Sequence, residues 1–392
     1  MKTNIPERIA ALREAMRQQK VDAYIIPSSD PHLSEYPADR WKSREWISGF
    51  TGSAGTIVVT ADKAGLWTDS RYFLQAASQL EGSGIELYKL ALPETPSITE
   101  FLLHELHAGQ AVGLDGQTYS AAEASALANK LSRKEIKLDT SADLIEGIWK
   151  DRPAVPGNPI FEMPEALSGA SVHEKLDLIN NQLRSEGADC LILAALDEIA
   201  WTFNIRGTDV TYNPVVVSYA FVSEDESVLF IKPEKLTAEI TEHLKKEGVT
   251  LAEYSMIQRY LSRLPENSRV FVDMNKTNVS LYDAIPGNCT IVEGISPANH
   301  LKSIKNETEI KGFQNAVVKD GVALTKFYIW LEKQMAEGAQ VTEISAAEKL
   351  TALRAEQPQY IMDSFGTICG YAEHGAIVPV SYTHLTLPTK LE

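Results

Sequence analysis

A repeat with a spacing of 167 residues constrains the fold of this chain more than any other sequence feature. The matching positions are a helix cap, an acidic residue in the first turn, three apolar helix positions, three apolar strand positions and a following aspartate. The register holds without a gap over more than 25 residues. In order, it pairs Asn4 with Ser171, Glu7 with Glu174, Ile9 with Leu176, Leu12 with Ile179, Met16 with Leu183, Tyr24–Ile26 with Leu191–Leu193, and Asp30 with Asp197.

This repeat predicts two α/β domains of like topology. A Ser, Thr, Asn or Asp followed three residues later by Glu is typical of a helix start, and apolar residues at helical spacing mark the face of that helix toward a core. The stretches 30–59 and 196–222 continue each copy with polar residues, a turn and a buried strand, which in the second copy is predicted at Val215–Val217. Two unrelated helix–strand units are the alternative interpretation.

Proline content divides the chain further. Four prolines and one glycine fall within 151–164, a composition typical of a linker. The sequence therefore predicts a first domain at 1–150, this linker, and a second domain at 165–302.

The region from residue 303 differs from both copies. Asn306 is positioned to cap a long helix that runs to about Met335, and Thr342 begins a second helix that runs to about Glu356. The long helix carries an apolar stripe suited to a core, made up of Ile310, Phe313, Val317, Leu324, Tyr328 and Leu331. Two helices with hardly any strand cannot close a large α/β core, so this third part is expected to be incomplete.

Composition excludes several classes of protein. The net charge of −16 argues against nucleic-acid binding, which requires a basic surface. No apolar run approaches the roughly 20 residues that span a bilayer, and the first 19 residues lack the apolar core of a signal peptide. The three cysteines are far apart, which favours a reducing compartment. We therefore expect a cytoplasmic protein without membrane or nucleic-acid partners.

Few residues carry a recognisable chemical motif. His104 and His107 are spaced to share a helix face, where an exposed surface is a simpler interpretation than a metal site. Arg71 follows a predicted strand and the acidic Asp69, so its guanidinium could bind a carboxylate or a peptide carbonyl. The alternative for Arg71 is an ion pair with Asp69 or Asp62, and Arg206 is expected in an interdomain ion pair.

Six segments together resemble one family. The segments IIPSSDPHLSEY, SGFTGSAGTIVVT, LWTDSRYFLQAA, IWKDRPAVP, LDEIAWTFNIRGTDVTYNPVV and SIKNETEIKGFQNA occur in the order typical of the three-domain Xaa-Pro aminopeptidases, members of the pita-bread metallopeptidases. The resemblance covers about residues 5–378. It implies two related N-terminal creatinase-like α/β domains followed by a pita-bread catalytic domain.

The resemblance also implies a reaction and its participants. Family members form homodimers and remove the first residue from peptides with proline in second position. Two metal ions, usually manganese, are held by two Asp, one His and two Glu, and they activate a bridging hydroxide. Arg71 matches the position at which the first domain contacts the peptide, so it is the one substrate-binding residue assigned.

The end of the sequence departs from the family pattern. The segment DSFGTICGYAEHGAIV still resembles the entry to the catalytic domain, but Pro379 stands where the family has a substrate-binding histidine. The remaining residues to Glu392 lack the expected continuation and resemble a non-native tail over 379–392. No catalytic residue and no metal ligand can therefore be assigned, and we expect 303–378 to be a truncated catalytic domain without activity. A non-catalytic peptide-binding or dimerising fragment is the alternative. A creatinase-like hydrolase is disfavoured, because creatinase has a single N-terminal domain.

Overall fold

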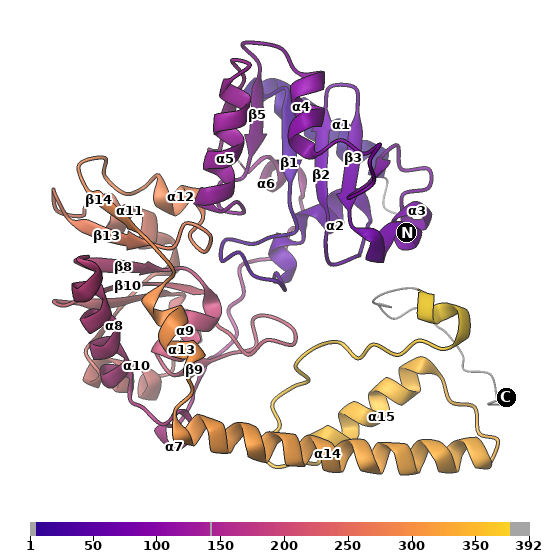
Figure 1. Cartoon of the computed structure of the whole chain (residues 1–392), viewed down its shortest axis with the longest axis vertical. Helices are drawn as coiled ribbons and strands as arrows, with labels where there is room; N and C mark the ends of the chain where they lie inside the picture. The colour runs from indigo at the N-terminus through magenta and orange to yellow at the C-terminus, as the bar shows by residue number, and fades with distance from the viewer. Residues whose placement is uncertain (1–4, 142, 377–392) are drawn as a thin grey trace.

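Two six-stranded sheets with the same strand arrangement dominate the fold, and a helical third part follows them (Figure 1). The structure, a computed structural model, describes residues 5–141 and 143–376. The predicted cap at Asn4, Pro379 and the tail at 379–392 lie outside these residues.

The first domain has the strand order β4-β3-β2-β1-β5-β6. Strand β1 is antiparallel to β2 and parallel to β5, which makes it the centre of a mixed sheet. The strands are β1 (Ala23–Ile26), β2 (Thr56–Thr60), β3 (Ala64–Thr68), β4 (Glu86–Lys89), β5 (Ala111–Leu114) and β6 (Lys137–Asp139). The helices are α1 (Ile5–Gln19), η1 (Asp39–Trp41), α2 (Ser43–Ser48), η2 (Ser70–Tyr72), α3 (Phe73–Gln79), α4 (Ile98–Glu105), α5 (Ala121–Ser132) and α6 (Leu144–Ile148).

The second domain repeats this sheet in the order β12-β11-β10-β8-β13-β14. A short ribbon of β7 and β9 is added beside it. The strands are β7 (Phe161–Glu162), β8 (Cys190–Leu193), β9 (Ile205–Arg206), β10 (Ser218–Ser223), β11 (Ser227–Ile231), β12 (Val249–Ala252), β13 (Arg269–Val272) and β14 (Thr290–Glu293). The helices are α7 (Glu165–Ser168), α8 (Val172–Glu186), α9 (Leu196–Thr202), η3 (Pro233–Lys235), α10 (Ala238–Lys246), η4 (Tyr254–Met256), α11 (Ile257–Leu261), α12 (Val279–Tyr282) and α13 (Pro297–Ser303).

The 167-residue repeat is confirmed element by element. Helix α1 and strand β1 are followed at that spacing by α8 and β8, and each pair has the same length. The central strands β1 and β8 also have the same neighbours in the same directions. The copies diverge after these strands, because Leu196 begins α9 whereas residues 29–38 contain no helix.

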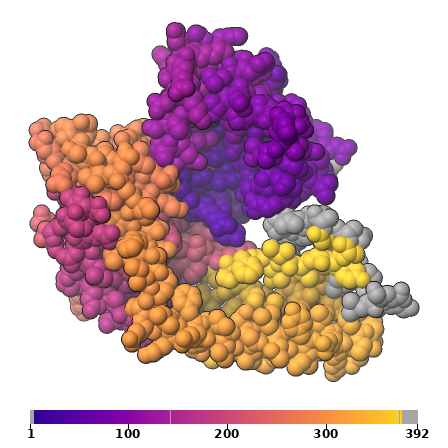
Figure 2. Space-filling view, in the orientation of Figure 1, coloured from indigo at the N-terminus to yellow at the C-terminus, as the bar shows by residue number. Residues whose placement is uncertain are grey.

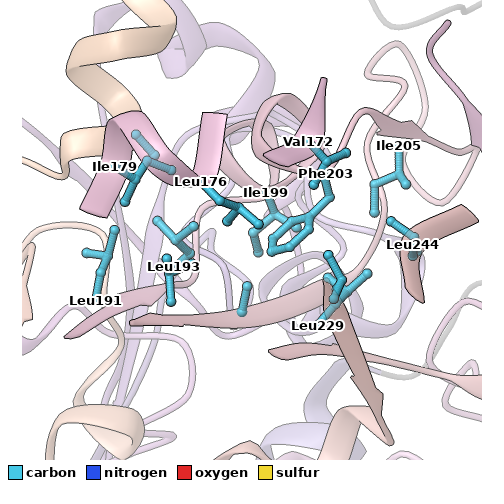
Figure 3. Packing of buried hydrophobic residues seen from close by; sticks show 14 of the residues in the cluster. Val172, Leu176, Ile179, Leu191, Leu193, Ile199, Phe203, Ile205, Leu229 and Leu244 are labelled. Atoms are coloured by element: carbon cyan, nitrogen blue, oxygen red, sulfur yellow. The ribbon is translucent and has the colours of Figure 1, made fainter. Parts of the chain in front are cut away.

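The repeated apolar stripes form the cores. Figure 3 shows Leu176 and Ile179 of α8 facing Leu191 and Leu193 of β8. In the first domain, Ile9, Leu12 and Met16 of α1 are buried in the corresponding cluster. Side chains of this size contribute about 1.5–3 kcal/mol each when they are fully buried. The periodicity of each first helix thus identified one face of each core.

One predicted strand is wrong. Val215–Val217 are buried but precede the strand, which begins at Ser218. The backbone N–H of Val217 donates to the carboxylate of Asp209 at 2.7 Å instead of to a neighbouring strand. A β-branched buried run is compatible with a strand, but here a side-chain acceptor satisfies the backbone.

The loop after β1 joins the two domains. Pro31 accepts a hydrogen bond from the Asn278 amide at 2.7 Å, and the His32 Nδ1 lies 2.8 Å from the carbonyl oxygen of Ala194. A shared apolar cluster continues this contact; it includes Ala38 and Trp41 from the first domain and Leu196, Val210 and Val217 from the second.

The third part consists of α14 (Glu307–Ala336), α15 (Glu343–Ala355) and η5 (Ala372–Ala376). The predicted capping by Asn306 is confirmed: its side chain accepts from the N–H of Glu309, whose side chain accepts from the N–H of Asn306. Thr342 caps α15 in the same way. None of the helices in residues 5–141 and 143–376 combines the length and apolar character needed to cross a membrane.

The apolar stripe of α14 lies on the expected helix, and most of it is exposed among the described residues. Phe313, Val317 and Tyr328 are 60%, 70% and 59% exposed, and Ala323 is the buried residue of this helix. Helix α15 and the short α7 pack against α14. Two neighbours of this size leave most of a 30-residue helix uncovered.

Candidate functional site

Arg71 lies at the turn between β3 and α3, as its sequence position indicated. Asp69 caps the intervening turn η2 and accepts the backbone N–H of Arg71 at 3.1 Å. The same carboxylate accepts two further hydrogen bonds from the Arg71 guanidinium, through Nε and Nη2, each at 2.8 Å. Of the two pairing partners that the sequence left open, the structure therefore selects Asp69.

This paired arrangement fixes the guanidinium without burying it. The side chain of Arg71 is 52% exposed and that of Asp69 is 36% exposed. The hydrogen bonds from Arg71 lower the pKa of Asp69, and those to Asp69 raise the pKa of Arg71. In the described part of the chain Nη1 of Arg71 has no hydrogen-bond acceptor, so its two N–H groups remain available to a ligand.

Arg71 borders a cavity of about 700 Å³ between the two domains. The walls are rich in hydroxyl groups, and they carry both signs of charge. The first domain contributes Glu35 and Glu123, and the second contributes Lys276. The hydroxyl groups belong to Ser28, Ser29, Ser34, Ser53, Thr56, Thr118, Tyr119 and Ser120. An open, polar cavity with an oriented guanidinium is suited to an extended peptide, whose carbonyl groups need donors.

A second, smaller cavity adjoins the first. It has a volume of about 260 Å³ and shares Ser28, Glu35 and Ser53 with the cavity of Arg71. The sequence did not single out its buried guanidinium, Arg44, or its aromatic side chains. No pattern in the sequence distinguishes Arg44, which lies beside Glu45 in the short polar start of helix α2.

Arg206 does not form the interdomain ion pair that was expected. Its Nη1 donates to the carbonyl oxygens of Ala200 and Ile205, at 2.6 and 2.9 Å. Burial lowers the pKa of Arg206, although Glu309 acts in the opposite direction. The residue therefore fastens α9 to β9 within the second domain.

His104 and His107 do not share a helix face as the spacing predicted, because α4 ends at Glu105. His104 is 83% exposed and lies 2.9 Å from a carboxylate oxygen of Glu105, while His107 lies beyond the helix end. This confirms the interpretation as an exposed surface.

Residues 5–141 and 143–376 contain no group of three or more His, Cys, Asp or Glu side chains placed to hold a metal ion. In the third part, Glu343 lies 3.4 Å from His374, and its carboxylate also accepts the N–H of Tyr371 at 2.5 Å. Asp363 instead accepts from Thr351 and lies 3.7 Å from Arg354. These donors hold the chain after α15 against the helix, and they do not fit a two-metal centre.

The domains are arranged so that the first domain faces the third part. In the space-filling view the indigo and purple first domain lies above the yellow residues of the third part, and the second domain borders both (Figure 2). Tyr212 of the second domain lies close to Gly366 of the third part, because a Cβ placed on Gly366 would lie 3.4 Å from the Tyr212 hydroxyl.

Comparisons with known families agree with this architecture. The sequence pattern of the creatinase/prolidase N-terminal domain matches residues 8–148, and a second form of the same domain matches 151–309. A crystal structure of an X-prolyl aminopeptidase from Caenorhabditis elegans, described as a cytosolic enzyme with a di-nuclear active site, superposes with a TM-score of 0.87 and 30% identity. The superposition covers 93% of this chain and 62% of that one.

Curated proteins show the same relationship. A probable Xaa-Pro aminopeptidase P of Laccaria bicolor is 38% identical over 384 residues, which cover 96% of this chain and 59% of the relative. Aminopeptidase P2 of Arabidopsis thaliana is 36% identical over 411 residues, with 96% and 58% covered. The chain thus spans about three-fifths of the length of these relatives. The chain therefore carries two consecutive domains that match the creatinase/prolidase N-terminal domain, and it is similar over most of its length to part of the Xaa-Pro aminopeptidase P proteins.

Proposed function

We propose that the protein from which this chain derives is an Xaa-Pro aminopeptidase. It would be a hydrolase that releases the N-terminal residue from peptides with proline in second position. The observation that carries this proposal is the similarity to Xaa-Pro aminopeptidase P proteins over 96% of the chain. The likeness to the nematode X-prolyl aminopeptidase at a TM-score of 0.87 supports it.

In this reaction the two sheet domains would bind the peptide. The guanidinium of Arg71 is held by Asp69 through Nε and Nη2, so no side-chain freedom is lost when Nη1 binds a peptide carbonyl. A preoriented donor gives more affinity than a mobile one, because the cost of ordering it is already met by folding. The hydroxyl-rich walls of the same cavity offer further donors and acceptors.

The catalytic step would take place outside the residues described. The resemblance implies two manganese ions, but the donor set described in residues 303–376 does not fit them. We therefore assign no step of hydrolysis to residues of this chain, and we propose that the chain itself has no peptidase activity. In this proposal residues 1–150 and 165–302 are the domains joined by 151–164, 303–378 begin the catalytic domain, and 379–392 are not part of it.

An assay of the purified chain tests the proposed lack of activity. A peptide with proline in second position is incubated with the chain and added manganese, and release of the first residue is followed by mass spectrometry. We expect no release above the rate without protein. Turnover that disappears with a chelator would show that the chain holds a complete catalytic site.

A second candidate function is peptide binding or dimerisation without catalysis. The observation in its favour is that the cavity of Arg71 is built by the first two domains alone. Arg71→Ala should lower the affinity for an Xaa-Pro peptide about tenfold in calorimetry, whereas Arg133→Ala, which removes an exposed arginine from the end of α5, should not. Equal affinities in the two variants would remove Arg71 from the binding site.

Assembly and location are proposed from the same resemblance. We expect a homodimer in the cytoplasm, and sedimentation equilibrium of the purified chain measures the first property. A monomer at all concentrations tested would indicate that this chain lacks the dimer contacts of the family.

A further inference from the structure

The smaller cavity lies between the loop after β1 and the loop of residues 210–212. Its walls include Tyr36 and Trp41 on the first domain and Tyr212 on the second, together with two prolines. Both signs of charge also line it, from Arg44, Lys42, Glu35 and Glu45. The rings of Tyr36 and Tyr212 approach edge to face, with their centroids 6.5 Å apart. The volume of about 260 Å³ equals that of roughly nine water molecules in the liquid, which is enough for one amino-acid residue.

A buried guanidinium forms part of this cavity. Arg44 is 6% exposed. Its Nε donates to the Ser28 hydroxyl at 2.9 Å, and Nη1 and Nη2 donate to the carbonyl oxygens of Phe50 and Gly52. All three acceptors are neutral, and these bonds use three of the five N–H groups of arginine.

In the described part of the chain, no carboxylate lies within ion-pair distance of Arg44 or of the buried Lys175, whereas other buried cations are paired. Lys235 is paired with Asp209, and Arg152 with Asp143 and Glu146. A buried charge without a counterion is costly, and burial lowers the pKa of Arg44 to about 10. Glu45, the next residue, raises that pKa from a greater distance. A bound anion would remove this cost directly.

The position of the cavity connects it to the peptide site. It shares Ser28, Glu35 and Ser53 with the cavity of Arg71, so the two cavities adjoin. Tyr212 also lies close to Gly366 of the third part. A peptide lying along the larger cavity can therefore end in the smaller one.

We propose that the smaller cavity binds the C-terminal residue of a short peptide, with the carboxylate on Arg44 and the side chain between Tyr36, Trp41 and Tyr212. This inference rests on the proposed function, because it assumes that the larger cavity binds peptides. The charge of Arg44 selects a free carboxylate, and the aromatic walls select an apolar or aromatic terminal side chain. The protein would thus prefer short peptides whose C-terminus reaches this cavity.

Calorimetry with the full chain tests the proposal with four probes. These are the tripeptides Ala-Pro-Phe and Ala-Ala-Phe, each as the free acid and as the C-terminal amide. Mass spectrometry of the solution in the calorimeter after each titration verifies that the peptides are intact. We expect the acids to bind at least tenfold more tightly than the amides. Equal binding of acid and amide, or no binding of any peptide, would overturn the proposal.

Two variants locate the effect. Arg44→Met should abolish the preference for the acid, but it also removes three hydrogen bonds that organise a loop. Tyr212→Ala, at a half-buried residue, keeps those bonds and should weaken binding of both acids about tenfold, while Tyr212→Phe should bind like the parent chain. Unchanged affinity in Tyr212→Ala would contradict the proposed position of the terminal residue.

The same four probes separate this inference from the proposed function. A preference for the acid without a preference for proline would support the cavity and contradict proline-specific recognition. A preference for proline with equal binding of acid and amide would support proline-specific recognition and contradict the binding of the C-terminal carboxylate in the smaller cavity.

Discussion

Lys235 and Asp209 form an ion pair in which the two side chains are 0% and 1% exposed. One carboxylate oxygen of Asp209 accepts from both Lys235 and the backbone N–H of Val217. Asp209 therefore holds the loop of residues 210–217, which carries Tyr212, against the start of β10.

Removing the carboxylate should leave Lys235 charged and unpaired in the interior. We expect Asp209→Ala to lower the free energy of unfolding by about 3–5 kcal/mol, since a single partner removed from a buried pair has this effect. Asp39→Ala, which breaks the exposed pair with Lys42, should cost about 0–1 kcal/mol. Urea unfolding of both variants measures the difference. Equal decreases in unfolding free energy would show that the buried pair stabilises the fold no more than the exposed pair does.

His32 should make stability fall as the pH falls. Its ring is buried against Tyr219 and Tyr254, its Nδ1 lies 2.8 Å from the Ala194 carbonyl oxygen, and its Nε2 lies 2.9 Å from the Tyr254 hydroxyl. Burial lowers the pKa of His32, against the attraction of Asp30 and Asp209, while Lys235 lowers it further. The unfolded state therefore binds a proton more readily, and stability is lost as pH falls through the unfolded value near 6.5.

A variant isolates this contribution. The unfolding free energy of His32→Asn, in which an amide can still donate to Ala194, should depend less on pH between 5 and 7 than that of the parent chain. His104→Asn, which alters an exposed ring, should keep the parent slope. The prediction fails if His32→Asn and His104→Asn give the same profile.

Asp115 should contribute a pH dependence of opposite sign. Burial first, and then repulsion from Asp143, raise its pKa to about 7. The folded state keeps this proton after the unfolded state has lost it, so the stabilising effect is complete below about pH 3.9 and is lost as the pH rises toward 7. The unfolding free energy of the parent chain should fall by roughly 1–3 kcal/mol over this range because of Asp115, and Asp115→Asn should not show this fall. Asp62→Asn, at an exposed turn, is the control, and a profile of Asp115→Asn that matches the control would contradict the assignment.

Gly169 should tolerate a side chain less well than Gly248. Both have a positive φ, of +73° and +81°, which costs an alanine roughly 1–2 kcal/mol. At Gly169 a Cβ would also lie 2.5 Å from the Oδ1 of Asn306, whereas at Gly248 it would meet no atom within 4 Å. Asn306 caps α14 and donates to the carbonyl of Ser168 at 2.8 Å, so a shift of this residue would also weaken the helix start.

The two alanine variants therefore form a matched pair. Gly169→Ala should cost about 1 kcal/mol more than Gly248→Ala, the usual value of an N-cap, and should raise hydrogen exchange in the first turn of α14. Equal unfolding free energies in the two variants would indicate that Asn306 can move away from the added methyl group without loss of stability.

Local patterns in the sequence predicted the repeated parts well. The helix stripes, their caps and the strands that follow them depend on residues close in sequence, and the second copy provided an independent test of the first. Val215–Val217 were misassigned because their hydrogen-bond partner is a side chain, and no periodicity reports that. The stripe of α14 shows a related limit, since periodicity identifies the apolar face of a helix but not what covers it.

The candidate site was predicted in part. Arg71 was placed correctly after a strand, and Asp69 was one of two named partners. The cavity beside it depends on Lys276, which is brought to Arg71 only by the docking of the two domains. Arg44 and His32 were missed because each is buried and bonded to carbonyl groups that only the folded chain brings close. The aspartate two residues before His32, Asp30, was a weak sign of a turn.

The apolar cluster between the domains has a consequence for synthesis on the ribosome. Domains generally fold as units from the N-terminus, so the first sheet can form as soon as its strands emerge. Ala38 and Trp41 are nevertheless covered by Leu196, Val210 and Val217. The nascent first domain must therefore expose this apolar surface until residues 196–217 have been translated, an interval in which a chaperone could bind it.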